Sequence, residues 1–324
     1  MASRRKTAQR SAAPVEADEA GGRLAPLPPG KIRLHKHADI ENGFVKIAHH
    51  CLLTIEWNRR AWLESDFADG LHQMRVGLRR LRSALQLFKD AFHLPDALAG
   101  ELRWLLSVLG PARDWEVFCA TTLPQVDACS AGQADLGFLQ KEAATKARET
   151  RRAAMAAVQS PRYHSLRLAL NLWLDNRAWH DNSDAAGRAM PLAAFAADRL
   201  THRHRSLVRS GSKLDVGDPD THHRLRIAVK RARYTVEFFQ PLFPARPIRR
   251  YLLTLNALQD QLGTLNDLAV ACILLETLAK SRRRGRSSRL IELAFVRGFL
   301  VATMRQKMEV LAHCRLPEKL PPLG

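Results

Sequence analysis

HQMRVGLRRLRSALQLFKDAF, residues 72–92, is the stretch of this sequence that predicts its fold. At about 100° per residue on a helix, its apolar positions fall in one narrow stripe, a pattern typical of a core-facing side. The stripe comprises Leu71, Met74, Leu78, Leu81, Leu85, Phe88 and Phe92. A second stripe, roughly a quarter-turn away, is basic and contains His72, Arg75, Arg79, Arg82 and Lys89. Arg80 points away from both stripes, so the spacing ranks it below its neighbours as a ligand contact.

The same pattern recurs in HRLRIAVKRARYTVEFFQPLF, residues 223–243, at an offset of 151 positions (72 to 223). Its apolar stripe holds Leu225, Val229, Ala232, Val236, Phe239 and Phe243, and its basic stripe holds His223, Arg226, Lys230 and Arg233, with Arg231 matching Arg80. Downstream, LGPARD (109–114) matches LGTLND (262–267) at an offset of 153. Two matching blocks in the same order indicate an internal repeat of two related halves.

Apolar positions recur at helical spacing from about residue 36 onward, and no convincing alternating strand interrupts them. The sequence therefore predicts an all-α fold of two related helical halves, which suggests paired bundles. Gly110-Pro111 is expected to separate two helices, and Asp218 or Asp220 to cap the helix that follows. The predicted divisions are a disordered leader at 1–30, a first helical half at 31–185, a second at 186–318 and a tail at 319–324.

The composition narrows the class of partner. The 324 residues carry a formal net charge of +19, and most of this excess lies outside the leader. Such a body is expected to meet a polyanion, an acidic membrane surface or an acidic protein. The five cysteines form no CxxC pair, which argues against a disulfide framework or zinc finger. No apolar run approaches the length of a membrane span, no secretory signal is evident, and we expect a cytoplasmic protein.

The basic stripes have a plain alternative explanation as the solvated faces of amphipathic helices. Solvated faces usually mix charges, because acid–base pairs at i,i+4 are mildly stabilising. The first stripe has no acid between Asp69 and Asp90, and the second has only Glu237 near its end. Two uncompensated stripes, one in each half, favour an anionic ligand. At 1.5 Å per residue, a stripe of this length suits an extended ligand better than a single phosphate.

The blocks LHQMRVGLRRLRSALQLF, LGPARDWEVF, HRLRIAVKRARYTVEFF and LGTLNDLAVA, in this order, resemble the CHAD family of conserved-histidine α-helical domains. The resemblance covers about residues 36–316. It implies an all-α fold of two pseudo-symmetric, antiparallel, four-helix-bundle-like halves with a basic central groove or pore. It also implies binding of inorganic polyphosphate and association with polyphosphate granules. The binding positions that it implies are His72, Arg75, Arg79, Arg80, Arg82, His223, Arg226, Lys230, Arg231, Arg233 and Tyr234, with Arg203 and Arg209 as further candidates.

Catalysis and metal binding have less support in the sequence than anion binding. A metal-dependent phosphohydrolase needs paired carboxylates, but the matched acids Asp114 and Asp267 are expected to cap helix starts or to pair with arginines. Many members of this family carry a preceding catalytic domain with an ExExK motif, which this sequence lacks. Neighbouring histidines such as His49-His50 diverge on a helix, so no metal site or cofactor is expected. We therefore expect a protein that is not an enzyme.

Nucleic acid is the serious alternative ligand, since it is also a polyanion. Proteins that bind single strands usually offer exposed aromatic side chains for stacking. Here aromatic residues are 6% of the chain and fall largely within apolar runs. The basic segment at 280–289 could still bind nucleic acid non-specifically. The sequence leaves the oligomeric state open.

Overall fold

The computed structural model describes residues 24–65, 68–130, 135–179, 190–215, 217–280, 287–314, 316–317 and 319–322. Within these ranges the chain is helical and has no strand, apart from an isolated antiparallel bridge between Asp39 and Pro191. The predicted all-α class is confirmed. Most of the predicted leader, residues 180–189 around the predicted division between the halves, and residues 281–286 of the basic segment lie outside the described residues.

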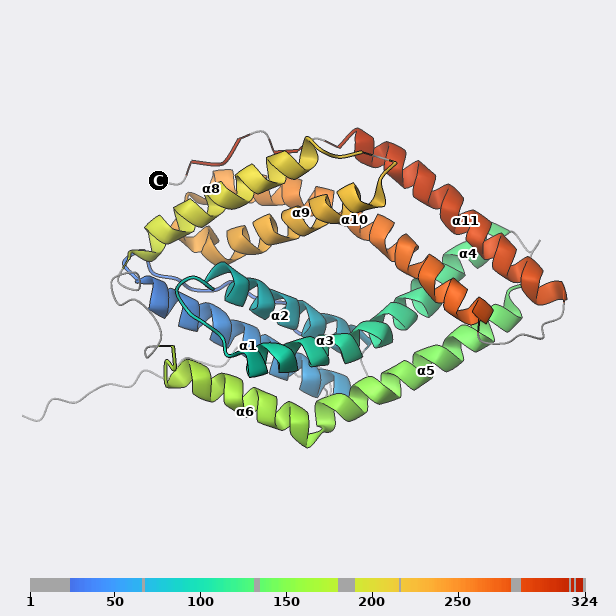
Figure 1. Cartoon of the computed structure of the whole chain (residues 1–324), viewed down its shortest axis with the longest axis horizontal. Coiled ribbons are helices and arrows are strands. Elements are labelled where there is room, and N and C mark those ends of the chain that lie inside the picture. Colours follow the sequence, from blue (N-terminus) through green and yellow to red (C-terminus); the bar gives the residue numbers. More distant parts are fainter. Residues whose placement is uncertain are drawn as a thin grey trace, which may run out of the picture.

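The first half of the chain builds an antiparallel pair and a set of helices that extends away from it (Figure 1). The elements are α1 (Ile40–Ser65), α2 (Ala68–Leu87), α3 (Asp96–Val117), the π-helical turn Phe118–Thr122, α4 (Leu123–Ser130), α5 (Gly137–Gln159) and α6 (Pro161–Asp175). The basic stretch of the first repeat lies on α2, which packs closely on α1. Gly77 permits this approach, because a Cβ atom there would lie 2.9 Å from Cγ1 of Ile55.

The second half also starts with a pair of helices that pack on each other. Its elements are α8 (Leu192–Gly211), α9 (Pro219–Phe239), the 3₁₀ turn Gln240–Leu242, α10 (Ala245–Lys280) and α11 (Ser287–Ala312). The second basic stretch lies on α9, which packs on α8 and α10. Asp218 caps α9 by accepting a hydrogen bond from the backbone N–H of Asp220 at 2.9 Å, which confirms the predicted cap. Pro219 occupies the first helical position, where a missing N–H is tolerated.

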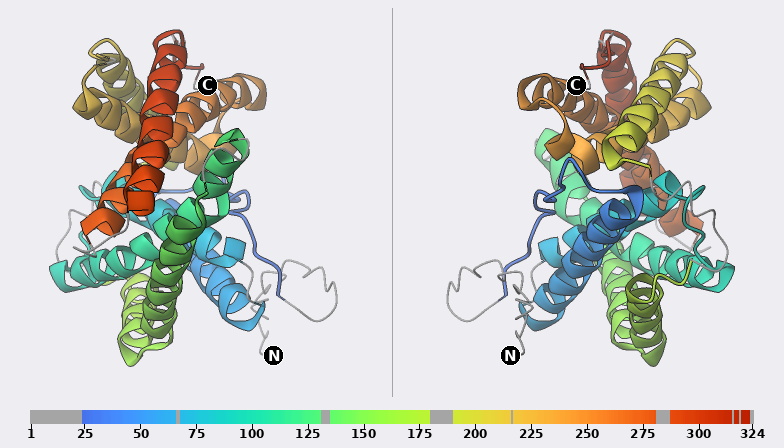
Figure 2. Two further views of the ribbon diagram at one scale, coloured as in Figure 1. Left: turned by 90° about the vertical axis from the view of Figure 1, so that its right-hand side faces the viewer. Right: turned by 90° about the vertical axis from the view of Figure 1, so that its left-hand side faces the viewer.

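The two halves share a hydrophobic core. Leu71, Met74, Leu78 and Leu81 of α2 are buried together with Leu225 and Val229 of α9 in one cluster, so both predicted apolar stripes are confirmed as core faces. A smaller second cluster joins the end of α3 and α5 to α10 and α11 through residues such as Trp115, Phe118 and Leu275. Figure 2 shows the long helices α5 and α11 crossing at this end of the molecule. The two clusters leave a polar region between them.

The prediction that Gly110-Pro111 separates two helices is wrong. Pro111 lies inside α3, which continues to Val117, and the matching LGTLND block lies inside the 36-residue α10. A proline inside a helix removes one backbone hydrogen bond. Here the surrounding Leu105, Leu109, Ala112 and Trp115 are all buried, so tertiary packing holds the helix continuous across the local breaker.

Candidate functional site

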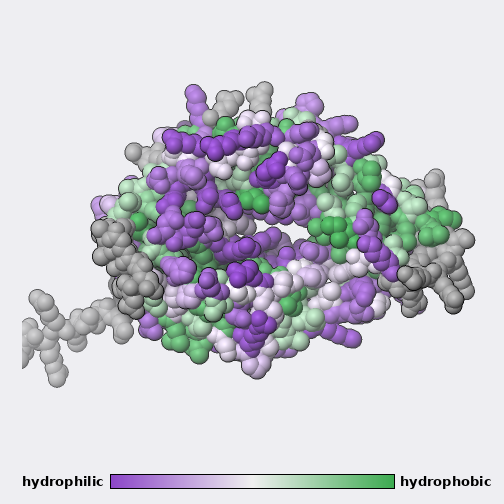
Figure 3. Space-filling model, in the orientation of Figure 1, coloured by the Kyte–Doolittle hydropathy of each residue, from purple (hydrophilic) through white to green (hydrophobic). Residues whose placement is uncertain are grey.

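A cavity of about 770 Å³ lies between the two halves, bounded by α2, α3, α9 and α10. In the space-filling view the centre of the molecule is hollowed, and hydrophilic residues border the opening (Figure 3). The polar region left between the two hydrophobic clusters is therefore an accessible site.

Both copies of the repeat point basic side chains into this cavity. His72, Arg75 and Arg79 reach it from α2, and Arg226, Lys230 and Arg233 reach it from α9. Positions three and four apart share one face of a helix, so the spacing of each stripe places its members side by side. Because the apolar stripes of α2 and α9 meet in the core, the adjacent basic stripes converge on the same space.

Four of these cations make no direct ion pair in the described part of the chain, and two aspartates that line the cavity attract them only at longer range. Ion pairs among the described residues include none to Arg75, Arg79, Arg226 or Lys230, and Nε of both Arg79 and Arg226 is buried without a hydrogen-bond acceptor there. Burial lowers the pKa of Arg75 and Arg226, since it disfavours the charged form. Buried polar groups normally have hydrogen-bond partners, so we expect an anion to bind among these side chains.

The pKa of Lys230 is strongly lowered by burial and by the neighbouring positive charges. Burial, followed by the neighbouring Arg226 and Arg79, lowers the pKa of its ammonium group to about 7. A neighbouring anion would favour the protonated form and raise that pKa again. The cavity without a ligand therefore holds a lysine whose charge depends on pH near neutrality.

Asp114 and Asp267 line the cavity as well, one from each half. Neither caps a helix start: Asp114 lies near the end of α3 and Asp267 within α10, so that part of the prediction is wrong. Pairing with an arginine fits better, because Arg75 is the main influence that lowers the pKa of Asp114. Burial is the larger effect and raises that pKa overall, and the nearby Asp267 acts in the same direction.

The two histidines that the resemblance implied as binding residues, His72 and His223, lie in different environments. His72 lines the cavity, but burial and the neighbouring Arg113 and Arg79 lower its pKa below the ordinary value. It is therefore largely neutral at pH 7 in the absence of a ligand. His223 is exposed and does not line the cavity. The titratable group of the cavity near neutral pH is thus Lys230 rather than either histidine.

Several predicted binding residues lie outside the cavity: Arg80, Arg82, Arg203, Arg209, His223 and Arg231. Arg80 is buried and forms an ion pair with Glu237, while Arg82, Arg209 and Arg231 are exposed. Arg203 is half-buried on α8, where burial and the nearby Arg231 and Arg199 lower its pKa. Of the remaining predicted residues, Tyr234 does line the cavity.

The sequence prediction missed several cavity residues, among them one arginine and two side-chain amides. Arg113 on α3 and Asn266 on α10 occupy the same position of the two LGxxxD blocks, and Gln259 lies two turns before Asn266. Arg113 also pairs with Glu116 at 2.8 Å. The repeat carries a signal for two of them, because Arg113 and Asn266 directly precede the matched aspartates Asp114 and Asp267.

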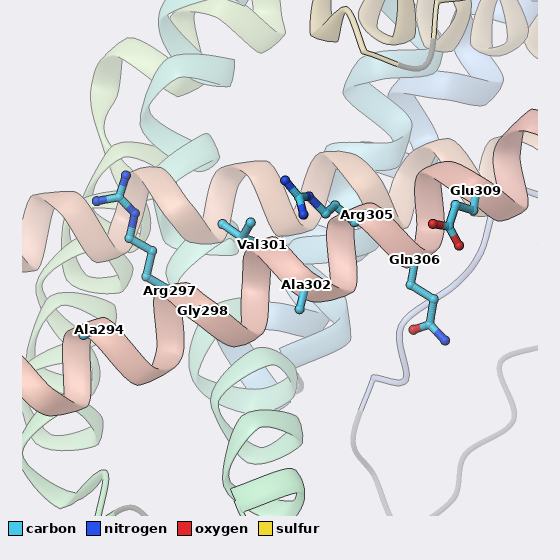
Figure 4. A pocket seen from close by; sticks show the side chains of 8 residues that line it. All are labelled: Ala294, Arg297, Gly298, Val301, Ala302, Arg305, Gln306 and Glu309. Atoms are coloured by element: carbon cyan, nitrogen blue, oxygen red, sulfur yellow. The ribbon is translucent and has the colours of Figure 1, made fainter.

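Other features are weaker candidates. A hollow on the outer face of α11 is lined by residues of that helix alone, among them Arg297, Arg305 and Glu309 (Figure 4). Its charged side chains extend along the helix and do not converge on one point. Among the described residues, no group of three His, Cys, Asp or Glu side chains comes together as metal ligands.

One described helix, α10, is long and apolar enough by length and composition to cross a membrane. Core helices pass the same test, so this is weak evidence for a membrane segment. Leu255, Leu258 and Leu262 of α10 are buried in the core shared by the two halves. Gln259, Asn266 and Asp267 of the same helix line the cavity.

Comparisons with known proteins identify the same fold in solved structures. The chain is 36% identical to the crystal structure of the CHAD domain from the plant Ricinus communis, with a TM-score of 0.78 over 91% of this chain and 99% of that one. PptA from Streptomyces chartreusis shares the fold at 17% identity, with a TM-score of 0.59 over 86% of this chain and 98% of that one.

Relatives among curated proteins are longer than this chain. Two proteins from Mycobacterium tuberculosis, the uncharacterized proteins MT2285 and Rv2226, are each 30% identical over 191 residues, which is 55% of this chain and 35% of theirs. The chain thus spans about a third of their length. Residues 46–276 match the CHAD domain family, and this protein belongs to that family.

Proposed function

We propose that this protein binds inorganic polyphosphate in the central cavity and does not turn it over. The observation that carries the proposal is the convergence on one cavity of four cations from α2 and α9 that form no direct ion pair among the described residues, with Nε of Arg79 and Arg226 buried and without an acceptor there. Guanidinium and ammonium groups bind phosphoryl oxygens through short charge-assisted hydrogen bonds. Arginine suits this task because its planar fork can hold two oxygens at once.

The shape of the site favours an extended ligand. Six Lys and Arg side chains, namely Arg75, Arg79, Arg113, Arg226, Lys230 and Arg233, are distributed over three helices around about 770 Å³. A single phosphate could satisfy a few of them at most, whereas successive phosphates of a chain could meet many. The residues that line the cavity include only two aromatics, Phe118 and Tyr234, and both are buried.

The proposal is tested by the double substitution Arg75→Glu with Arg226→Glu. We expect loss of binding to long-chain polyphosphate, measured by calorimetry, with the helical circular dichroism retained. Arg82→Glu with Arg231→Glu is the matched control, because it makes the same charge change on the same two helices at exposed positions outside the cavity. Equal losses in both variants would mean that overall charge, not the cavity, governs binding.

Nucleic acid remains the alternative, because contacts to phosphate alone do not distinguish two polyanions. Single-stranded nucleic acid gains affinity from bases stacked on aromatic rings, and the ring of Tyr234 already faces the guanidinium of Arg233 at 4.6 Å. We expect polyphosphate to displace bound single-stranded DNA at equal phosphate concentration and fixed ionic strength. Displacement in the opposite direction would favour the nucleic-acid function.

We also propose that the protein does not hydrolyse its ligand. Incubation with polyphosphate and Mg²⁺ should give neither shorter chains nor free phosphate, and release of phosphate would make the protein an enzyme.

In cells we propose a cytoplasmic protein that gathers on polyphosphate granules. A fluorescent fusion should form foci that coincide with polyphosphate stain, and those foci should disappear in the Arg75→Glu, Arg226→Glu variant.

A further inference from the structure

A series of side-chain hydrogen bonds links the contact between α2 and α9 to the cavity. Arg80, on α2, donates from Nη1 to Oε2 of Glu237, on α9. Arg233, one turn earlier on α9, donates from Nη1 to Oε1 of the same carboxylate. Nε of Arg233 donates to Oε1 of Gln259 on α10 at 2.7 Å. Glu237 thus joins a buried arginine from one half to a cavity arginine from the other.

The three charged residues differ in how far they are buried. The side chain of Arg80 is 6% exposed, and those of Glu237 and Arg233 are each 17% exposed. Arg80 lies 5.1 Å from the ring centre of Phe238, among core side chains. A cation this deep is strongly destabilising when its partner is removed, so Arg80 is a structural residue whose counter-ion is Glu237.

Arg233 is held in place without relying on Glu237 alone. Its guanidinium lies over the ring of Tyr234 at 4.6 Å and is bonded to Gln259. Loss of the carboxylate at position 237 would leave these two contacts intact. The main contribution of Glu237 to the cavity is then its negative charge, which compensates the charge of Arg233.

The first copy of the repeat has no equivalent. Gln86 occupies the position that matches Glu237, and Arg82 the position that matches Arg233. Both Arg82 and Gln86 are exposed and do not line the cavity. The carboxylate therefore belongs to one half only, where the matched arginine faces the cavity.

We propose that Glu237 sets the affinity of the cavity by compensating the charge of Arg233, with Arg80 as its buried counter-ion. This rests on the proposed binding of polyphosphate. In the resting protein Glu237 withholds one arginine from the ligand, which weakens binding and keeps the ligand exchangeable. Glu237 is thus a positioning residue that acts through Arg233 and does not contact the ligand.

The experiment measures polyphosphate affinity against salt concentration. Each phosphate that a protein cation neutralises adds about 0.7–0.9 to the slope of log K against log[salt] for nucleic acids, and the same counterion release applies to polyphosphate. We expect Glu237→Gln to bind about two- to fivefold tighter, as for one partly solvated charge contact, and to steepen the slope by about one contact. Because this variant leaves Arg80 without its counter-ion, Arg80→Met with Glu237→Gln provides a second, better-packed form with the same expected result.

The controls separate charge from structure. In an Arg233→Gln background, Glu237→Gln should change neither the affinity nor the slope. Gln86→Glu, the reciprocal substitution in the first copy, should also leave both unchanged. A folded Glu237→Gln or Arg80→Met, Glu237→Gln protein with an unchanged or shallower slope overturns the proposal, as does an equal gain in the Arg233→Gln background. Wild-type protein that binds no polyphosphate overturns the proposed function itself, so the two failures are distinct.

Discussion

Helices α2 and α9 carry nearly the same pattern of residues, yet they place matched arginines in opposite environments. Arg80 is buried against Glu237, whereas its counterpart Arg231 is exposed. Arg82 is exposed, whereas its counterpart Arg233 lines the cavity. Only the matched pairs Arg75–Arg226 and Arg79–Lys230 reach the cavity from both copies. A repeat in sequence thus preserves the backbone and the apolar stripe more faithfully than the role of each charge.

The seam between the halves explains the difference. α2 and α9 pack directly against one another, and the single acid Glu237 near their contact attracts Arg80. Arg231 is exposed on α9, and no ion pair among the described residues involves it. Glu237 supplies the partner that offsets the burial of Arg80, so the position of one carboxylate decides which of two matched arginines is internal.

The largest expected effect concerns these two matched arginines. Arg80→Met should lower the free energy of unfolding by about 2–4 kcal/mol, because Glu237 loses one of its two counter-ions in a buried site. Arg231→Met should change it by less than about 0.5 kcal/mol, as for an ordinary surface position. Urea unfolding followed by circular dichroism measures both. Similar changes in the free energy of unfolding for the two variants would show that Arg80 and Arg231 contribute equally to stability.

The next effect concerns Lys230, the counterpart of Arg79, and the dependence of stability on pH. In the folded protein the pKa of Lys230 is about 7, below the unfolded value of 10.5. Between these values the unfolded chain binds more protons, so the stability of the ligand-free protein rises with pH. Each pKa unit corresponds to about 1.4 kcal/mol, and partial solvation reduces the total, so we expect a gain of about 1–2 kcal/mol from pH 7 to pH 9.

Lys230→Met is the reference for this measurement, since it removes the titrating group and keeps most of the side-chain volume. Its unfolding free energy at pH 7 should exceed that of the wild type, and its rise toward pH 9 should be smaller by the same 1–2 kcal/mol. Equal pH profiles for the two proteins would show that Lys230 is fully solvated when the cavity is empty.

The same lysine predicts how binding depends on pH. As pH rises through about 7, Lys230 of the ligand-free protein loses its proton, and binding must then recover it. We expect affinity for long-chain polyphosphate to fall about three- to tenfold from pH 6 to pH 8. Lys230→Arg should flatten the profile, because arginine stays protonated. His72→Gln should keep the fall, and its loss in that variant would assign the dependence to the histidine.

The smallest expected effect compares Arg113 with its counterpart Asn266. Arg113 lines the cavity but is already paired with Glu116, and its side chain is 27% exposed. Arg113→Asn, which makes the two copies identical at this position, should weaken polyphosphate binding about two- to fivefold. Asn266→Arg should strengthen it by a similar factor. Calorimetry at fixed salt measures both, and no change in either variant would place the ligand away from α3 and α10.

Much of the fold could be predicted from spacing alone. The apolar stripe from Leu71 to Phe92 and its counterpart from Leu225 to Phe243 are core faces in the structure, because a period of 3.6 residues dictates which side chains share a side of a helix. The helix around Pro111 could not be predicted, since the local signal of Gly110-Pro111 is that of a break and only the packing of Leu109, Ala112 and Trp115 overrides it.

The candidate site was predictable in part for the same reason. Helical spacing identified Arg75 and Arg79 as neighbours and set Arg80 apart, and the repeat supplied Arg226 and Lys230. Spacing could not reveal that Arg82 is exposed while its match Arg233 lines the cavity, because that depends on how α2 and α9 meet. Nor could it give the lowered pKa of His72 and Lys230, which arises from burial and from charges on other helices.

The sequence by itself determined the helices, the repeat and an excess of positive charge on one face of each copy, because these follow from residue order and helical period. The tertiary structure decided which of those charges face one cavity, which one is neutralised by Glu237 and which remain in solvent. The physical reason is that electrostatic energy depends on distance and burial between elements far apart in the chain. Those distances exist only after α2 and α9 have packed together.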